Sequence, residues 1–289
     1  MENDFNRWLD QIKNFYRQED RRPGCLREIG YVPRWTVVIA EGEQWGIAFN
    51  FTGGHGHPGI DSPDELGDIR YLIGRDLFYC AEKLLDAETL PQRSLASAVL
   101  NALSRPFSTR AALEERGMTE EPPNLLPPLF PDDKVVVIGY GGLPQRLREH
   151  VKVVHVSEMR PAKSFYTWRI GTAVTRGPQQ IVFHSAEENA ELLSDADVVF
   201  MTGCTLVNGT FSSLMEQSKH ARFHGVYGPS AGLLPECLWN EGVDWISTYR
   251  IEEENALLDR LTGDGSSDLF VNGLRNHVIL NPESSSAKP

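Results

Sequence analysis

The sequence has no long hydrophobic run. No apolar stretch among its 289 residues approaches the roughly 20 residues that a membrane-spanning helix needs. The first twenty residues, Met1–Asp20, are charged and lack the apolar centre of a secretion signal. We therefore expect a cytoplasmic protein with no membrane partner.

Cysteine is scarce and basic charge is in deficit. The four cysteines show none of the short paired spacings of a zinc site or a redox dithiol: Cys25, Cys80, Cys204 and Cys237. Forty acidic side chains against 28 basic ones give a formal charge of −12, which argues against nucleic acid as a partner. A cation or a small molecule fits this charge better. Hydrophobic residues make up 40% of the chain, as in ordinary soluble globular proteins.

The segment Asp197–Phe211 combines an apolar strand with a polar turn. Its start, Val198–Met201, is continuously apolar, which is typical of a strand buried on both faces of a parallel sheet. Hydroxyls, an amide and a thiol then surround two glycines, in Thr202, Gly203, Cys204, Thr205, Asn208, Gly209 and Thr210. A helix is expected from Phe211, and the junction of a strand end with a helix start is where open α/β sheets bind ligands. The alternative is that Asn208 or Thr210 only caps that helix.

Two more strands end in similar turns. Lys134–Ile138 precedes Gly139, Gly141 and Gly142, and Arg222–Tyr227 precedes Gly228, Pro229 and Ser230. Because the carboxyl ends of parallel strands share one edge, we expect these turns and the polar residues Thr202, Gly203, Asn208 and Thr210 to face one cleft.

Glu158 follows Gly139 by 19 residues, near the position where an acidic residue meets ribose hydroxyls in dinucleotide-binding folds. The glycine fingerprint is incomplete, however, because Pro144 stands where the third glycine belongs. These residues favour a nucleotide-type cofactor, such as an adenine nucleotide or S-adenosylmethionine. The alternative is a tight strand-to-helix turn without a ligand.

The N-terminal region has a different pattern. Phe5–Tyr16 has the spacing of an amphipathic helix, and strand-like runs at Arg34–Ala40 and Gln44–Phe51 flank a short turn, which predicts a β-hairpin. Helices are expected at Leu66–Leu85 and Leu95–Leu103. The sequence therefore predicts a smaller α+β domain over residues 1–119.

A proline-rich segment follows over residues 120–133 and is incompatible with a helix interior or a central strand. We interpret it as the linker to a second domain over residues 134–289. Strands and helices alternate there, which predicts an α/β fold with a doubly wound, Rossmann-like parallel sheet. The loop over residues 158–177 is aromatic and basic, and it either covers a ligand or forms a homodimer contact.

Two histidines lie in a glycine-rich loop over residues 52–59. The side chains of His55 and His57 are two residues apart, a spacing at which both imidazoles can reach one divalent transition-metal ion. Cys204 is the third candidate ligand, since a thiolate near a helix start is a soft donor. The alternatives are a solvated loop and a packing cysteine. Spacing shows no Ser-His-Asp arrangement, although His155, His184, His220 and His224 are available.

The motifs as a set resemble a known family. Met201–Phe211, the segment Tyr-Gly-Pro-Ser-Ala from Tyr227 and Gly-Val-Asp-Trp-Ile from Gly242 are similar to the putative heavy-metal chelation family of Rossmann-like domains. Arg34-Trp-Thr-Val-Val, Trp45-Gly-Ile-Ala-Phe and Ala98-Val-Leu-Asn-Ala-Leu resemble the enolase-N-terminal-like domain that members commonly carry. The resemblance implies an interdomain site with a role in metal or corrinoid metabolism. The chain differs from the common pattern at Cys204, where a serine is expected.

Two functions follow as hypotheses. The first is binding of a metal or metal-containing small molecule between the domains. The second is an enzyme that uses a nucleotide-type cofactor on a small-molecule substrate. A purely structural role is disfavoured, because polar turns follow several strand ends.

Overall fold

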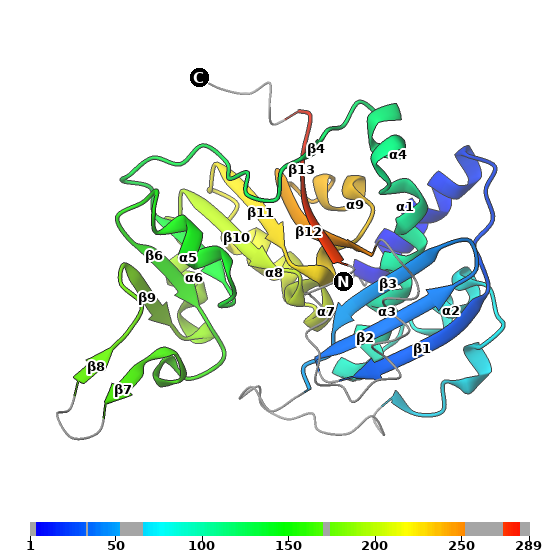
Figure 1. The fold of residues 1–289 in the computed structure, drawn as a ribbon, viewed down its shortest axis with the longest axis horizontal. Helices are drawn as coiled ribbons and strands as arrows, with labels where there is room; N and C mark the ends of the chain where they lie inside the picture. The colour runs from blue at the N-terminus through cyan, green and yellow to red at the C-terminus, as the bar shows by residue number, and fades with distance from the viewer. Residues whose placement is uncertain (1–3, 33, 53–65, 170–173, 252–273, 284–289) are drawn as a thin grey trace.

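The computed structural model describes residues 4–32, 34–52, 66–169, 174–251 and 274–283, and it contains two packed parts (Figure 1). The first part combines a three-stranded antiparallel sheet with helices. Its elements are α1 (Asp4–Gln18), β1 (Leu26–Val32), β2 (Trp35–Ala40), β3 (Gln44–Phe49), the 3-10 helix η2 (Arg70–Leu72), α2 (Leu77–Lys83), α3 (Leu90–Ser104), the 3-10 helix η3 (Arg105–Phe107) and α4 (Arg110–Glu115).

The predicted hairpin is confirmed as β2 and β3, and β1, which the pattern did not predict, pairs with β2. The predicted amphipathic helix is α1. The single helix expected over Leu66–Leu85 is wrong: the chain forms η2 and then α2, whose start is capped by Asp76. Helix α3 begins earlier than expected, because Pro91 lies in its first turn. The backbone N–H groups there have no acceptor within the helix, so a proline, which lacks the N–H, is tolerated.

The second part is built on one eight-stranded sheet. Its elements are β4 (Glu120–Glu121), β5 (Val135–Ile138), α5 (Leu143–Leu147), β6 (Val154–Ser157), η4 (Ala162–Phe165), β7 (Thr167–Arg169), β8 (Val174–Arg176), β9 (Ile181–His184), η5 (Ala186–Glu188), α6 (Asn189–Ser194), β10 (Val198–Thr202), α7 (Cys204–Asn208), α8 (Phe211–Gln217), β11 (Phe223–Tyr227), η6 (Pro229–Ala231), α9 (Pro235–Trp239), β12 (Trp245–Ile251) and β13 (Leu274–Leu280).

The strand order is β4-β13-β12-β11-β10-β5-β6-β9. The run from β12 to β9 is parallel, and β13 and β4 add antiparallel strands at one edge. Among the parallel strands of this sheet, taken in chain order, the first, β5, lies beside the fourth, β10, so chain order reverses between them, as in dinucleotide-binding folds. The predicted doubly wound, Rossmann-like sheet is confirmed. The loop over residues 158–177 contains the antiparallel ribbon β7–β8, which projects away from the sheet in Figure 1.

Alternate residues of the central strands enter two separate cores. Val135 and Val137 of β5 belong to a core with α5, whereas Val136 and Ile138 belong to a core with α6 to α9. The second core continues into α1, α3 and the small sheet, so one apolar cluster joins both parts of the chain.

Close packing of α3 on β3 explains the small residues of that helix. A Cβ added at Gly46 would lie 1.9 Å from the carbonyl oxygen of Ala98. Asn101 of α3 donates its Nδ2 hydrogen to the Ile47 carbonyl at 2.8 Å and to the Ser230 carbonyl at 3.3 Å. Helix α3 therefore fixes the small sheet relative to the turn after β11.

The proline-rich segment, residues 120–133, lies along the large sheet. Glu120 and Glu121 form β4, and the leucines that follow pack on the core containing α5, at Leu125, Leu126 and Leu129. The indole Nε1 of Trp245 donates a hydrogen bond to the Leu125 carbonyl at 3.3 Å. The segment thus covers a sheet face, and the domain boundaries at 119 and 134 stay predictions.

Candidate functional site

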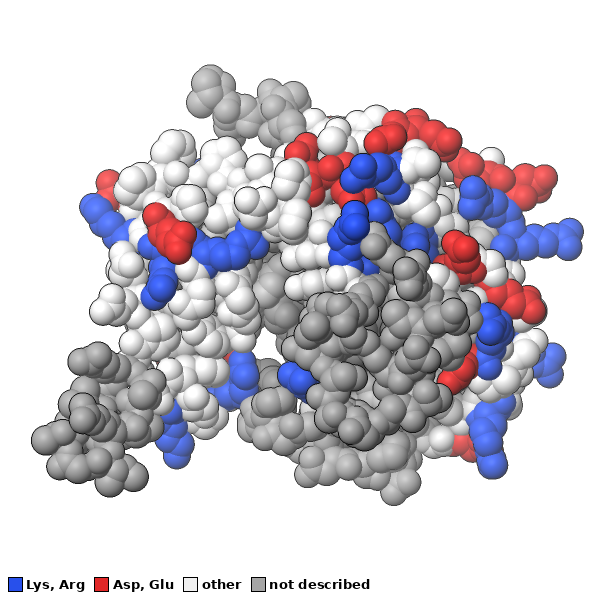
Figure 2. Space-filling model, viewed as in Figure 1, with Lys and Arg blue, Asp and Glu red and all other residues white. Residues whose placement is uncertain are grey.

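A cleft lies where the small sheet meets the carboxyl ends of β5, β6, β10 and β11. It consists of two adjoining cavities of about 350 Å³ and 440 Å³. The cavities share Arg34, Phe49, Gly141, Thr202, Cys204 and Tyr227. Because β5 and β10 are the neighbours at which chain order reverses, the cleft occupies the usual ligand position of open α/β sheets. Figure 2 shows the molecular surface hollowed between the two parts.

The turns singled out from the sequence line this cleft. The cavity of about 350 Å³ is lined by Gly139, Gly141, Glu158, Thr202, Cys204, Asn208 and Thr210. The other is lined by Gly141, Gly142, Thr202, Gly203, Cys204, Gly228, Pro229 and Ser230. His55 and His57 lie outside the described residues. The topology of the parallel sheet therefore brings the three turns together, and their role in binding stays a prediction.

The segment after β10 forms a short helix that ends at a left-handed glycine, where the sequence predicted a polar turn. Cys204–Asn208 forms α7, which ends at Gly209 with a left-handed φ of 76°. The Asn208 side-chain oxygen accepts hydrogen bonds from the Thr210 amide at 3.1 Å and the Thr210 hydroxyl at 2.8 Å. Asn208 thus stabilises the junction between α7 and α8. Thr210 precedes α8 but makes no side-chain capping bond there.

The glycine turn after β5 lies under a tyrosine. Gly139 has a left-handed φ of 88°, and its carbonyl accepts a 2.6 Å hydrogen bond from the Tyr227 hydroxyl. A Cβ added at Gly141 would lie 3.6 Å from the Tyr227 ring. Burial raises the pKa of the Tyr227 phenol, so it stays protonated as the donor of this bond. Tyr227 therefore covers the turn where a dinucleotide fold would hold its pyrophosphate.

Both oxygens of the Glu158 carboxylate accept hydrogen bonds within the protein. The carboxylate accepts them from the Tyr140 amide at 2.8 Å, the Arg160 amide at 3.0 Å and the Arg160 Nη2 at 2.8 Å. Burial alone would raise its pKa, but the bonds from Arg160 and Tyr140 outweigh burial and hold the pKa of Glu158 below its ordinary value. A ribose hydroxyl would compete with these donors for the same oxygens.

The Cys204 thiol is protonated at neutral pH. Burial raises its pKa to about 11, although a hydrogen bond with the Thr202 side chain acts in the opposite direction. The suggestion of a thiolate at this helix start is wrong for the protein alone, because α7 has one short turn and desolvation dominates. The sulfur lines both cavities and is still a soft donor for a metal ion.

The small sheet contributes a cation and two aromatic rings. Arg34 and Phe51 have left-handed φ values of 74° and 61°, which are unfavourable for residues with a side chain. The buried Asn50 holds this open end of the hairpin: its Nδ2 donates to the Val32 carbonyl at 2.9 Å, and its oxygen accepts from the Thr52 hydroxyl at 2.7 Å. This network directs Arg34 and Phe51 into the lining of the cleft.

Ser230 connects the two parts at the floor of the cleft. Its hydroxyl oxygen accepts a hydrogen bond from the Phe49 amide at 2.9 Å, and its side chain is buried. Gly203 packs against the same turn, since a Cβ there would lie 2.7 Å from the Ala231 nitrogen. Both residues therefore have a structural role in shaping the cleft.

Several lining residues were not predicted as site residues: Arg34, Phe49, Phe51, Tyr140, Arg160 and Tyr227. The two tyrosines had a usable signal, because Tyr227 ends a buried strand and Tyr140 lies two residues after another, each of them next to a glycine. Arg34, Phe49 and Phe51 had none, because their position depends on how the small sheet packs on the large one.

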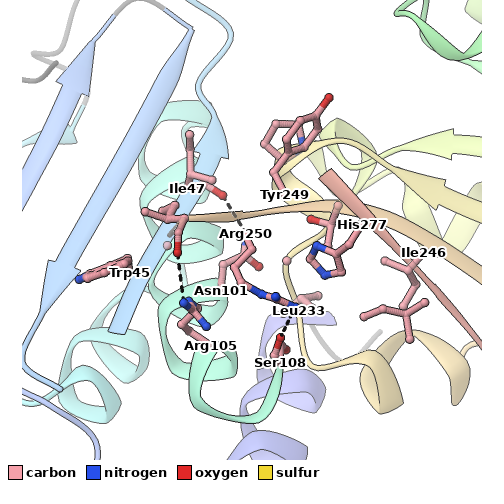
Figure 3. Close-up of a pocket in the computed structure, with 16 residues that line it drawn as sticks. Trp45, Ile47, Asn101, Arg105, Ser108, Leu233, Ile246, Tyr249, Arg250 and His277 are labelled. Atoms are coloured by element: carbon pink, nitrogen blue, oxygen red, sulfur yellow. Dashed lines mark hydrogen bonds between the residues drawn. The ribbon is translucent and has the colours of Figure 1, made fainter. Parts of the chain in front are cut away.

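A separate cavity of about 40 Å³ lies between α3 and the strands β12 and β13 (Figure 3). It is lined partly by Arg250, which donates to the Ser108 carbonyl and pairs with Glu120, and by the buried ring of His277. Burial, together with the charge of Arg250, lowers the pKa of His277 to about 4, so the ring is neutral. The volume suits ordered water, which satisfies buried polar groups.

In the described ranges of the chain no three histidine, cysteine, aspartate or glutamate side chains converge as a metal-ligand set. No helix in the described part of the chain is long and apolar enough to cross a membrane.

Two solved crystal structures share the fold over nearly the whole chain, and both are of proteins with unknown function from the DUF364 family. The structure from Pyrococcus horikoshii has a TM-score of 0.64 at 19% identity and covers 95% of this chain and 100% of its own. The structure from Desulfitobacterium hafniense has a TM-score of 0.67 at 17% identity and covers 94% and 99%. At these identities the likeness shows the fold alone.

Sequence comparison identifies the family. An uncharacterized protein of Methanocaldococcus jannaschii is 31% identical over 88 residues, a match that spans 30% of this chain and 34% of the relative. A family model, DUF4213, matches residues 18–104, and a second, DUF364, matches residues 124–279; both carry the description "Putative heavy-metal chelation". Because the second match covers more than half of the chain, the protein belongs to the DUF364 family of that description.

Proposed function

We propose that the protein binds a metal-bearing small molecule in the cleft between its two parts, as a component of metal, metallophore or corrinoid metabolism. The observation that carries this proposal is the position of the cleft between the small sheet and the large sheet. It opens at the chain reversal of the large sheet, and the small sheet closes it with Arg34, Phe49 and Phe51. The family description supports the metal as part of the ligand.

The lining suits an organic complex larger than a bare ion. Aromatic rings line one of the two cavities beside hydroxyl groups and two guanidinium groups, and its volume of about 350 Å³ is in the range of small-molecule sites. The charge of Arg160 is offset by Glu158, whereas Arg34 makes no ion pair with the described residues. Arg34 is therefore suited to a carboxylate or phosphate group of the ligand.

The proposed donors to the metal are His55, His57 and Cys204. Cys204 supplies sulfur at the carboxyl end of β10, and Phe51, which lines the same cavity, precedes His55 by four residues. Four residues of extended chain span at most about 14 Å, so both imidazoles are within reach of the cleft. Imidazole and thiolate together favour zinc, copper or nickel over magnesium or calcium.

Metal analysis of protein purified without an affinity tag tests this proposal, followed by calorimetric titration with zinc, copper and nickel. We expect the wild type to bind one more equivalent of metal than either Cys204→Ser or the His55→Ala/His57→Ala double variant. Cys25→Ser is the matched control, because this thiol lies outside both cavities. Equal binding by all four proteins, or no binding by any, contradicts the proposal.

An enzyme with a nucleotide-type cofactor is the second candidate. The strand order and the place of Glu158 at the end of β6 favour it. The engaged carboxylate of Glu158 and the hydroxyl of Tyr227 above Gly139 oppose it, because the cofactor would displace both. Saturable binding of an adenine nucleotide or S-adenosylmethionine, weakened in Glu158→Gln, with no metal bound, supports this candidate over the first.

Localisation and partners stay expectations from the sequence. The charge of −12 supports a cationic or neutral partner rather than nucleic acid or an anionic membrane. Whether the protein forms a homodimer is measurable by analytical ultracentrifugation. The proposal requires only one chain, since both sides of the cleft belong to it.

A further inference from the structure

Two histidines outside the cleft face each other at the edge of the large sheet. The Nδ1 of His155 on β6 lies 3.0 Å from the Nε2 of His184 on β9, and the ring centroids are 5.2 Å apart. Ser157 pairs with His184 in the β6–β9 register, so His155, two residues earlier, projects from the same face of the sheet. Since β9 is the outermost strand, the pair lies next to solvent.

A carboxylate fixes the orientation of one of these rings. The Nδ1 of His184 lies 3.2 Å from the Glu188 Oε2, and the Glu188 Oε1 accepts a hydrogen bond from the Ser185 amide at 2.8 Å. The hydrogen bond from the Ser185 amide, together with the hydrogen bond with His184, lowers the pKa of the Glu188 carboxyl group, which therefore stays ionised. With the His184 hydrogen on Nδ1, its Nε2 presents a lone pair toward His155. A histidine that donates one ring hydrogen to a carboxylate is the usual arrangement of a metal ligand.

We propose that His155 and His184 bind a zinc, copper or nickel ion at this edge, with water completing the coordination and Glu188 orienting His184. The metal replaces the hydrogen bond between the rings. New bonds form to the Nδ1 of His155 and the Nε2 of His184, and the His155 hydrogen moves from Nδ1 to Nε2 through solvent. Both rings stay neutral, so binding releases no net proton.

The geometry requires only a small adjustment. Two imidazole nitrogens at ~2.0 Å from one tetrahedral zinc ion lie roughly 3.3 Å apart, so the present 3.0 Å separation must widen by about 0.3 Å. Burial, with smaller effects of His184 and Lys134, lowers the pKa of His155, which keeps this ring in the neutral form that binds metal. Asp195, paired with Lys134 nearby, opposes that shift.

This site is independent of the proposed function of the cleft. Neither histidine belongs to the lining of either cavity there. The experiment therefore uses untagged protein with His55→Ala, His57→Ala and Cys204→Ser combined, which removes the proposed donors of the cleft. Further changes are His155→Ala, His184→Ala and Glu188→Gln, each made singly in that background. The matched control is His220→Ala, which removes an exposed imidazole elsewhere.

Titration with Zn²⁺ and Cu²⁺ is expected to show one equivalent bound in the background protein and in the His220→Ala control. His155→Ala and His184→Ala should each weaken metal binding at least tenfold, and Glu188→Gln should weaken it about 10- to 100-fold. Electron paramagnetic resonance of the Cu²⁺ complex of the background protein, in which His155 and His184 are both present, should show coupling to two imidazole nitrogens. This measurement needs no substitution at the pair, so it does not depend on variants that could fail to fold. Unchanged affinity in both histidine variants, or a Cu²⁺ spectrum without imidazole coupling, overturns the proposal.

Discussion

Metal binding at the cleft should depend steeply on pH if Cys204 is a ligand. The thiol must lose its proton to bind a metal, and burial has raised its pKa to about 11. Below that pH the protonated form dominates, so each further fall of one pH unit should weaken the apparent affinity about tenfold. From pH 9 to pH 7 the expected loss is therefore about 100-fold. An exposed thiol with the ordinary value of 9.0 would already be levelling off at the upper end of this range.

Isothermal titration calorimetry with Ni²⁺ at pH 7, 8 and 9 measures this effect. Titrations in two buffers with different ionisation enthalpies also give the number of protons released. We expect about one proton to be released for each metal bound at the cleft of the wild type, and none from Cys204→Ser, whose hydroxyl does not ionise. Cys25→Ser should behave as the wild type does. An affinity independent of pH, or equal proton release from Cys204→Ser and wild type, would refute a role of this thiol as ligand.

Three other changes test the structure of the cleft. Asn208→Ala should lower the free energy of unfolding, measured in urea, by about 0.5–2 kcal/mol, because the hydrogen bonds from Thr210 are lost. Asn208→Asp keeps the acceptor oxygen and is the control. Equal stability of Asn208→Ala and the wild type would exclude a stabilising role of Asn208 at the junction between α7 and α8. Folding lowers the pKa of the Glu158 carboxylate, so this group stabilises the protein above its unfolded pKa of 4.5, and the stabilisation is lost as the pH falls through the folded pKa. In Glu158→Gln the urea midpoint should therefore depend less on pH between pH 3 and 6 than it does in the wild type. The same pH dependence in both proteins would contradict this. Gly46→Ala should destabilise by ~3 kcal/mol or more in urea unfolding, because its Cβ would overlap the Ala98 carbonyl of α3, and a neutral effect would show that β3 can move away from the helix.

The parallel sheet was predictable because it depends on local pattern. Continuous apolar runs such as Val135–Ile138 and Val198–Met201 cannot keep one face in water, so they belong in a sheet covered on both sides. Their carboxyl ends share an edge in any such sheet. For this reason Gly139, Thr202 and Gly228 were expected together before any contact was known, and they do line adjoining cavities.

Elements that depend on distant partners were missed. The two-residue strand β4 exists only because β13 pairs with it. Strand β1 is longer, but its polar residues prevented its recognition as a strand. The Leu125 region has a proline content typical of linkers, yet its leucines pack on the large sheet, because that sheet face has little helix to cover it. Proline excludes a helix there but does not exclude burial.

The sequence by itself determined the layers of this protein and the edge at which a ligand would bind, because side-chain periodicity and glycine turns act over a few residues. Tertiary structure alone decided the chemistry of that edge. Packing of the small sheet on α3 brought Arg34 and Phe51 to the cleft, and the pairing of β5 with β6 brought the Tyr140 amide within hydrogen-bonding distance of the Glu158 carboxylate. Burial likewise turned Cys204 from a candidate thiolate into a thiol. Contacts and desolvation of this kind join residues far apart in the chain, and no local pattern encodes them.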